Sequence, residues 1–195
     1  MKSFEGIETV ASIGGGPIGG GWAAHFLAKG LKVKAYLHSK DEVTQYNDII
    51  EAAWVNLLKM GISEGASLNN LEISFELDEC LSGVDFVQES VPEILEIKQS
   101  FYSEIDNLLD QGIVISSSTS GLLISDITAK CSTSHRAVVG HPFNPPYLLP
   151  LVEIVGSSKT KPEILQWVSD FYSYFGKVPI ILKKEIPGFI ATRLQ

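Results

Sequence analysis

The sequence predicts an α/β fold in which a mostly parallel, doubly wound sheet is covered by helices on both faces. Short apolar runs typical of buried strands alternate with longer segments whose apolar residues recur at helical spacing. A glycine-rich turn lies between the first expected strand and the first expected helix. Strict alternation of this kind favours parallel strands, because two parallel neighbours must be joined by a crossover connection that is usually helical.

Composition limits the possible classes of protein. The chain has 195 residues, of which 45% are hydrophobic, enough for a sizeable core. Its net charge of −8 argues against nucleic acid and anionic membranes as partners. No apolar run approaches the ~18 residues that cross a bilayer, and the N-terminus has no leader pattern. Cys80 and Cys131 are isolated and lack metal-ligand spacing, so we expect reduced thiols, no bound metal and a cytoplasmic location.

Glycines and apolar periodicity delimit the expected elements. Gly30 ends the first helix and Gly112 the third, because glycine readily adopts the conformation that closes a helix. Helices are expected at 41–60 and 92–110, where apolar side chains recur at helical spacing. A proline-rich stretch at 141–150 separates two late strands. In chain order we expect strand 8–13, helix 17–29, strand 32–37, helix 41–60, loop 61–70, strands 71–75 and 84–88, helix 92–110, strands 113–117, 137–140 and 151–155, helix 162–175 and strand 178–182.

The glycine-rich turn at 13–21 has the G-x-G-x-x-G spacing of a dinucleotide-binding turn. Gly14 allows a tight turn, Gly16 lets a pyrophosphate approach the backbone, and Gly19 lets the helix pack closely on the strand. The N-terminus of the following helix offers unpaired N–H groups to the phosphates. The candidate cofactor contacts in this turn are Gly14, Gly15, Gly16, Pro17, Ile18 and Gly19.

These features divide the chain into two parts. We expect residues 1–185 to form an NAD(P)-binding, Rossmann-like domain. Residues 186–195 have the pattern of another helix that stops after two turns. We expect them to be the start of a truncated C-terminal helical domain.

The end of the second strand bears on which nucleotide the domain takes. In NAD-binding folds an acidic residue ~20 residues beyond the turn accepts hydrogen bonds from the adenosine ribose. Leu37 occupies that place here. Either His38 and residues 39–40 receive the 2′-phosphate of NADP, or Asp41 or Glu42 serves the ribose. NAD is therefore the expected cofactor, with NADP as an alternative.

A serine-rich segment and a histidine–glutamate pair suggest chemistry at the carboxyl edge of the sheet. Residues 116–122 follow a buried strand, which places them where α/β folds bind ligands. Glu153 lies in an apolar strand, where a carboxylate is costly unless it is paired, and His141 is its natural partner. Such a pair is suited to take a proton from an alcohol. Spacing alone leaves open a purely structural contact, or a solvent-facing Glu153 on an edge strand.

Longer motifs resemble those of the 3-hydroxyacyl-CoA dehydrogenase superfamily, in the family's order and over nearly the whole chain. They are the glycine turn, Ser-Ser-Thr-Ser-Gly-Leu at 117–122, His-Pro-Phe-Asn-Pro-Pro at 141–146 and Pro-Gly-Phe-Ile at 187–190. Within the superfamily, residues 139–153 look most like the L-carnitine dehydrogenases. The segments 86–93 and 120–123 point the same way.

The resemblance implies roles for four residues at the reacting end. His141 would be the general base that removes the 3-hydroxyl proton as hydride leaves C3 for the nicotinamide. Glu153 would orient His141 and stabilise its charged form. Ser120 would hydrogen-bond the reacting oxygen, and Asn144 would position substrate and nicotinamide, so both also count as cofactor contacts.

The resemblance also implies that Glu93 and Lys98 lie near the nicotinamide ribose. The alternative is a glutamate in the first turn of a helix and a lysine on its solvated face. Two positions depart from the family pattern. Leu37 replaces the ribose-binding acidic residue, and Thr192 replaces an asparagine near the second domain.

The function implied is an oxidoreductase that transfers hydride between a small 3-hydroxy acid and a nicotinamide, as a homodimer. L-carnitine, which gives 3-dehydrocarnitine, is the expected substrate. Phe143 and Tyr147 either line its trimethylammonium group, since aromatic faces attract cations, or pack in the core. Alternatives are a 3-hydroxyacyl-CoA or sugar-acid dehydrogenase, although the helix at 41–60 offers CoA only Lys59. A non-catalytic nucleotide-binding or structural protein is an alternative of another class.

Overall fold

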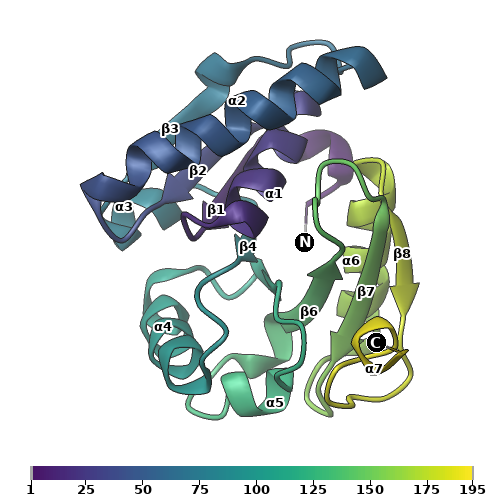
Figure 1. The fold of residues 1–195 in the computed structure, drawn as a ribbon. Helices are drawn as coiled ribbons and strands as arrows, with labels where there is room; N and C mark the ends of the chain where they lie inside the picture. The colour runs from purple at the N-terminus through teal and green to yellow at the C-terminus, as the bar shows by residue number, and fades with distance from the viewer. Residues whose placement is uncertain (1, 195) are drawn as a thin grey trace.

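A computed structural model describes residues 2–194, in which eight strands form one sheet (Figure 1). The strand order is β3-β2-β1-β4-β5-β6-β7-β8. Neighbouring strands are parallel except β6 and β7, which pair antiparallel. The strands are β1 (Thr9–Ile13), β2 (Lys32–Tyr36), β3 (Leu71–Ser74), β4 (Phe86–Glu89), β5 (Val114–Ser117), β6 (Ala137–Pro142), β7 (Leu151–Gly156) and β8 (Val178–Ile181).

Helices cover both faces of this sheet, which confirms the predicted fold class. The α-helices are α1 (Pro17–Ala28), α2 (Val43–Met60), α3 (Leu77–Leu81), α4 (Leu95–Leu108), α5 (Ile124–Ile127), α6 (Pro162–Tyr174) and α7 (Ala191–Leu194). The 3-10 helices are η1 (Phe4–Gly6), η2 (Lys40–Glu42), η3 (Leu68–Asn70) and η4 (Ser134–Arg136). No helix within residues 2–194 is long and apolar enough to span a membrane.

Two apolar cores lie on opposite faces of the sheet because successive strand side chains point to opposite sides. On β1, Val10 belongs to the core shared with α1, α2 and α6. Its neighbour Ala11 belongs to the core shared with α3, α4 and α5. The apolar runs of the strands therefore reflect burial on both faces, as parallel sheets require.

The structure differs from the sequence prediction in some element boundaries and in two short helices. The third long helix begins at Leu95 rather than residue 92, because Ile94 is extended. The strand expected at 137–140 continues to Pro142, because its antiparallel pairing with β7 continues through His141 and Pro142. The short helices α3 and α5 were not predicted, and each is too short to show a helical period.

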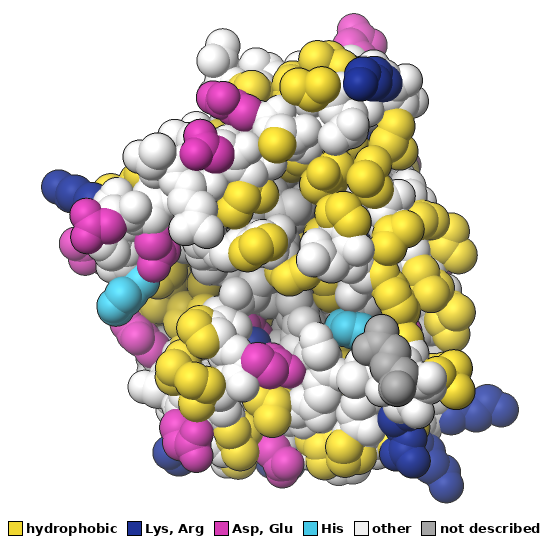
Figure 2. All heavy atoms as spheres, viewed as in Figure 1, with side chains coloured by type: hydrophobic (Ala, Val, Ile, Leu, Met, Phe, Trp, Pro, Cys, Tyr) yellow, Lys and Arg dark blue, Asp and Glu magenta, His cyan; other side chains and the backbone are white. Residues whose placement is uncertain are grey.

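The strand order reverses direction between β1 and β4, which is where open α/β sheets bind their ligands. The carboxyl ends of β1, β4 and β5 meet at one edge of the sheet. This edge carries the glycine turn, Ser90 and the serine-rich segment. Figure 2 shows that the molecule is hollowed on this face, between the part built by α1 and α2 and the part built by α4 and α5.

Candidate active site

The glycine turn has the backbone geometry that its sequence predicts. Gly14 has a φ of 109°, and a Cβ there would lie 2.5 Å from the Ser90 carbonyl oxygen. A Cβ on Gly19 would collide with the carbonyl oxygen of Gly14, so helix and turn touch through backbone atoms. Gly16 has no atom within 4 Å of its Cβ position, and it is the N-cap of α1. The turn is therefore closed on the protein side and open toward a ligand.

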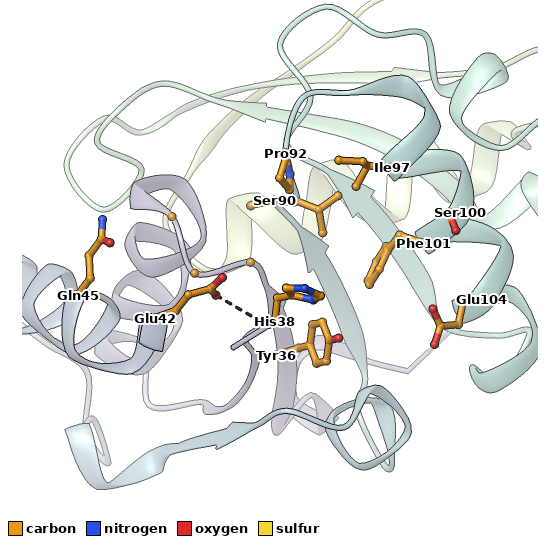
Figure 3. A pocket seen from close by; sticks show the side chains of 14 residues that line it. Tyr36, His38, Glu42, Gln45, Ser90, Pro92, Ile97, Ser100, Phe101 and Glu104 are labelled. Atoms are coloured by element: carbon orange, nitrogen blue, oxygen red, sulfur yellow. Dashed lines mark hydrogen bonds between the residues drawn. The ribbon is translucent and has the colours of Figure 1, made fainter. Parts of the chain in front are cut away.

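A cavity of about 820 Å³ lies beside this turn. Gly14, Gly15, Gly16 and His38, four of the residues predicted to contact the cofactor, line it. Figure 3 shows Tyr36, His38 and Glu42 on one side of the cavity, with Ile97, Phe101 and Glu104 of α4 on the other. The remaining predicted cofactor residues lie outside its lining: Pro17, Ile18 and Gly19 in the first turn of α1, and Glu93, Lys98, Ser120 and Asn144.

Lys98 is buried in an ion pair that the sequence analysis did not identify. Its side chain is 1% exposed, which excludes the alternative of a solvated helix face. The Lys98 Nζ lies 2.6 Å from Glu89 Oε1 and 3.1 Å from the Val91 carbonyl oxygen. The other Glu89 oxygen accepts a hydrogen bond of 2.6 Å from Ser117 Oγ. This network ties the end of β4 to α4 and β5.

Glu93 holds the loop that carries Ser120. Glu93 Oε1 accepts hydrogen bonds from Thr119 Oγ1 at 2.6 Å, from the Ser120 N–H at 2.8 Å and from the Gly121 N–H at 3.2 Å. Its other oxygen lies 3.6 Å from Lys98 Nζ. The Ser120 residue itself is exposed. Glu93 thus bridges the buried ion pair and the serine loop.

His141 and Glu153 are hydrogen-bonded, as the sequence analysis expected. They lie opposite each other on β6 and β7, with 2.8 Å between His141 Nδ1 and Glu153 Oε2. Glu153 is 2% exposed and β7 is an internal strand, so the alternative of a solvent-facing Glu153 is wrong. Glu153 Oε1 accepts the N–H groups of Ile190 and Ala191 at 3.0 and 3.1 Å. Both carboxylate oxygens are therefore hydrogen-bonded.

The start of α7 and the residues just before it connect this pair to the serine loop. Thr192 Oγ1 donates to the Ser120 carbonyl oxygen at 3.3 Å. Phe189 is fully buried, and its ring centre lies 5.5 Å from that of His141. The centre of the Phe143 ring lies 5.4 Å from that of His141. The histidine thus has two aromatic neighbours, of which the sequence had singled out only Phe143.

Residues 9–186 match the family described as 3-hydroxyacyl-CoA dehydrogenase, NAD binding domain. The chain belongs to this family. It is 45% identical over 195 residues to an L-carnitine dehydrogenase of Streptomyces coelicolor, and 43% identical over 194 residues to one of Pseudomonas putida. These alignments cover all of this chain but 61% and 60% of the two relatives. The chain therefore spans about three fifths of the length of the curated relatives it matches.

Solved structures agree with this membership. The fold matches a 5-formyl-3-hydroxy-2-methylpyridine 4-carboxylic acid 5-dehydrogenase, described as an NAD⁺-dependent dismutase, with a TM-score of 0.89 and 32% identity. That match covers 96% of this chain and 61% of the other. A 3-hydroxybutyryl-CoA dehydrogenase of Escherichia coli matches with a TM-score of 0.86 and 27% identity, over 94% of this chain and 39% of the other. NAD is the cofactor of this domain family, and the open turn at Gly16 fits it.

A buried lysine anchors the loop that follows His141 in this dehydrogenase domain. Lys177 is 6% exposed, and its Nζ donates to the carbonyl oxygens of Pro146 and Leu149. The same ammonium lies 5.1 Å from the centre of the Trp22 ring of α1. Pro146 packs on Gly21 of α1, where a Cβ would lie 2.8 Å from its Cδ. The loop bearing Asn144 is therefore fixed against the nucleotide-binding helix.

Burial and, to a smaller extent, the nearby Lys29 together lower the pKa of Lys177 from 10.5 to about 7. Between these two pH values the unfolded chain binds more protons than the folded chain at this residue. The contribution of Lys177 to the free energy of unfolding therefore rises as the pH rises above 7. We expect the free energy of unfolding of the wild type, relative to Lys177→Met, to increase from pH 7 to pH 9 in urea titrations. If the free energies of unfolding of the wild type and of Lys177→Met changed equally with pH, the two carbonyl groups would be keeping the Lys177 ammonium at its ordinary pKa.

Proposed function

We propose that this protein is an NAD-dependent dehydrogenase that oxidises L-carnitine at its 3-hydroxyl group. The observation that carries the proposal is the buried hydrogen bond between His141 and Glu153, on a domain that belongs to an NAD-binding dehydrogenase family. Nucleotide binding alone does not need a histidine oriented by a buried carboxylate. The L-carnitine dehydrogenases that resemble the chain over its full length support the substrate.

In the proposed reaction, His141 acts as the general base. Glu153 occupies Nδ1, which leaves Nε2 to take the proton from the substrate hydroxyl. A bound NAD would supply the acceptor for the hydride that leaves C3, so that the C3–O bond becomes a carbonyl. The Glu153 carboxylate stabilises the imidazolium that forms, and the N–H groups of Ile190 and Ala191 keep that carboxylate in place.

Two further residues complete the proposed site. The Ser120 hydroxyl would donate to the oxygen that becomes the carbonyl, a contact of the kind that stabilises developing charge. The Glu93 hydrogen bonds to the loop preorganise this donor. Asn144 lies exposed in the loop after β6, where it would position substrate and nicotinamide.

The trimethylammonium group of carnitine needs a lining that attracts a cation. Phe143 is partly exposed beside the His141 ring, and an aromatic face contributes ~0.5–2 kcal/mol to binding such a cation. Tyr147 instead packs against the core around α1, which favours the structural interpretation of this residue. Phe143 is therefore the aromatic contact that we propose.

The experiment that tests the function compares substrates on the complete protein with NAD. We expect kcat/KM for L-carnitine to exceed that for 3-hydroxybutyryl-CoA by at least tenfold, with D-carnitine as the stereochemical control. Faster oxidation of the thioester would instead assign the protein to acyl-CoA oxidation. Failure to reduce NAD with either substrate or with 3-hydroxy sugar acids would contradict the dehydrogenase proposal.

A further inference from the structure

The position that usually selects NAD cannot do so in this chain. Leu37 follows β2 directly, where the adenosine ribose of NAD usually meets a carboxylate. Its side chain is fully buried in the core shared with α1 and α2. Its backbone N–H donates to the Ser74 carbonyl oxygen, so the residue is also fixed in the sheet. A ribose-binding carboxylate must therefore come from elsewhere.

Glu42, in η2, places a carboxylate beside the end of β2, where the ribose-binding carboxylate usually lies. It ends η2, and its side chain turns back toward the cavity, so that Oε2 accepts the His38 N–H at 3.3 Å (Figure 3). A Cβ on Gly15 would lie 2.5 Å from this same oxygen. The carboxylate thus lies between the end of β2 and the glycine turn. This is the space that the adenosine ribose occupies in folds of this class.

The charges around the cavity oppose a 2′-phosphate. Glu42 and Glu104 line it, and none of its lining residues, all within 2–194, is a lysine or arginine. The nearest candidate in sequence, Lys40, places its ammonium 5.9 Å from the centre of the Phe75 ring. Phosphate groups are held in proteins by cations such as arginine, and beside a carboxylate they are repelled.

We propose that Glu42 is the residue that selects NAD over NADP. Its carboxylate accepts hydrogen bonds from the 2′- and 3′-hydroxyls of the adenosine ribose and repels a 2′-phosphate. The Glu42 side chain, which belongs to the 3-10 helix η2, thus takes the role of the carboxylate that is missing at the end of β2. The inference shares one assumption with the proposed function, which is that the cavity beside the glycine turn binds the adenosine half of a nicotinamide nucleotide.

The test is a fluorescence titration of the chain with NADH and with NADPH. The wild type is expected to bind NADH at least tenfold more tightly than NADPH. Glu42→Gln removes the charge and keeps the size, so NADH affinity should fall about tenfold and the preference for NADH should shrink or invert. Glu42→Asp keeps the charge, so discrimination against NADPH should persist while NADH affinity falls in part. Asp41→Asn, which removes the neighbouring carboxylate, is the matched control and should leave the ratio of the two Kd values unchanged.

The possible failures are distinguishable. An unchanged Kd ratio in folded Glu42→Gln would overturn the role of Glu42 and leave nucleotide binding intact. A shift produced by Asp41→Asn instead would assign selection to that residue. A wild type that binds neither nucleotide would overturn both this inference and the proposed function. Thermal unfolding of each variant shows whether it is folded. If Glu42→Gln did not fold, Glu42→Asp, which keeps the negative charge, would still test whether discrimination against NADPH persists.

Discussion

His141→Gln in the complete protein is expected to lower kcat by roughly 10²–10⁴-fold, the usual scale for loss of a general base. Glutamine can still donate a hydrogen bond to Glu153, so the β6–β7 pairing should survive. It cannot accept and hold the proton of the substrate hydroxyl. Steady-state kinetics with L-carnitine and NAD measure the loss, and NADH fluorescence should show little change in Kd.

His135→Gln is the matched control, because His135 lies in η4 and is not one of the residues placed in the site. It should leave kcat unchanged. If His141→Gln also turned over at the wild-type rate, His141 would have no part in the chemistry. The alternative of a non-catalytic nucleotide-binding or structural protein would then gain support.

Lys98→Met is expected to reduce the free energy of unfolding by about 3–5 kcal/mol, the usual cost of leaving one partner of a buried ion pair uncompensated. Glu89 is fully buried and would keep only its hydrogen bonds from Ser117 and the Val91 N–H. Urea denaturation followed by circular dichroism measures the change. A loss of this size is a large part of the stability of an ordinary domain.

Two control variants test whether the loss of stability comes from the unpaired buried charge of Glu89. The double variant Glu89→Gln/Lys98→Met removes both charges and should recover much of the stability, because no buried charge remains unpaired. Lys59→Met on the exposed end of α2 should change stability by at most about 0.5 kcal/mol. A single Lys98→Met variant as stable as wild type would show that Glu89 finds another partner or is protonated.

Much of the fold and part of the site were predictable from the sequence, because both depend on local patterns. Every expected strand and each of the four long helices is present, with boundaries that differ by a few residues. The glycine turn was predictable because Gly14, Gly16 and Gly19 each stand where the backbone must turn tightly, admit a ligand or pack closely. The contact between His141 and Glu153 was predictable because a carboxylate in an apolar strand requires a partner.

The remaining features depend on where side chains point after folding. Glu89 ends an apolar strand much as Glu153 lies in one, but its partner Lys98 stands on a helix whose sequence also fitted a solvated face. Glu42 remained one of two candidates because spacing does not show which way a side chain turns from a 3-10 helix. The extension of β6 through His141 was hidden by Pro142, a residue that usually argues against a strand.

The antiparallel pairing of β6 with β7 has a consequence for how this site can vary. The separation of His141 and Glu153 is set by strand register and not by the length of chain between them. The number of connecting residues can therefore change without changing the distance between His141 and Glu153. A slip of one residue in that register would instead turn one partner to the opposite face of the sheet. The sheet, and not the connecting loop, therefore sets the geometry of the pair on which the proposed proton transfer depends.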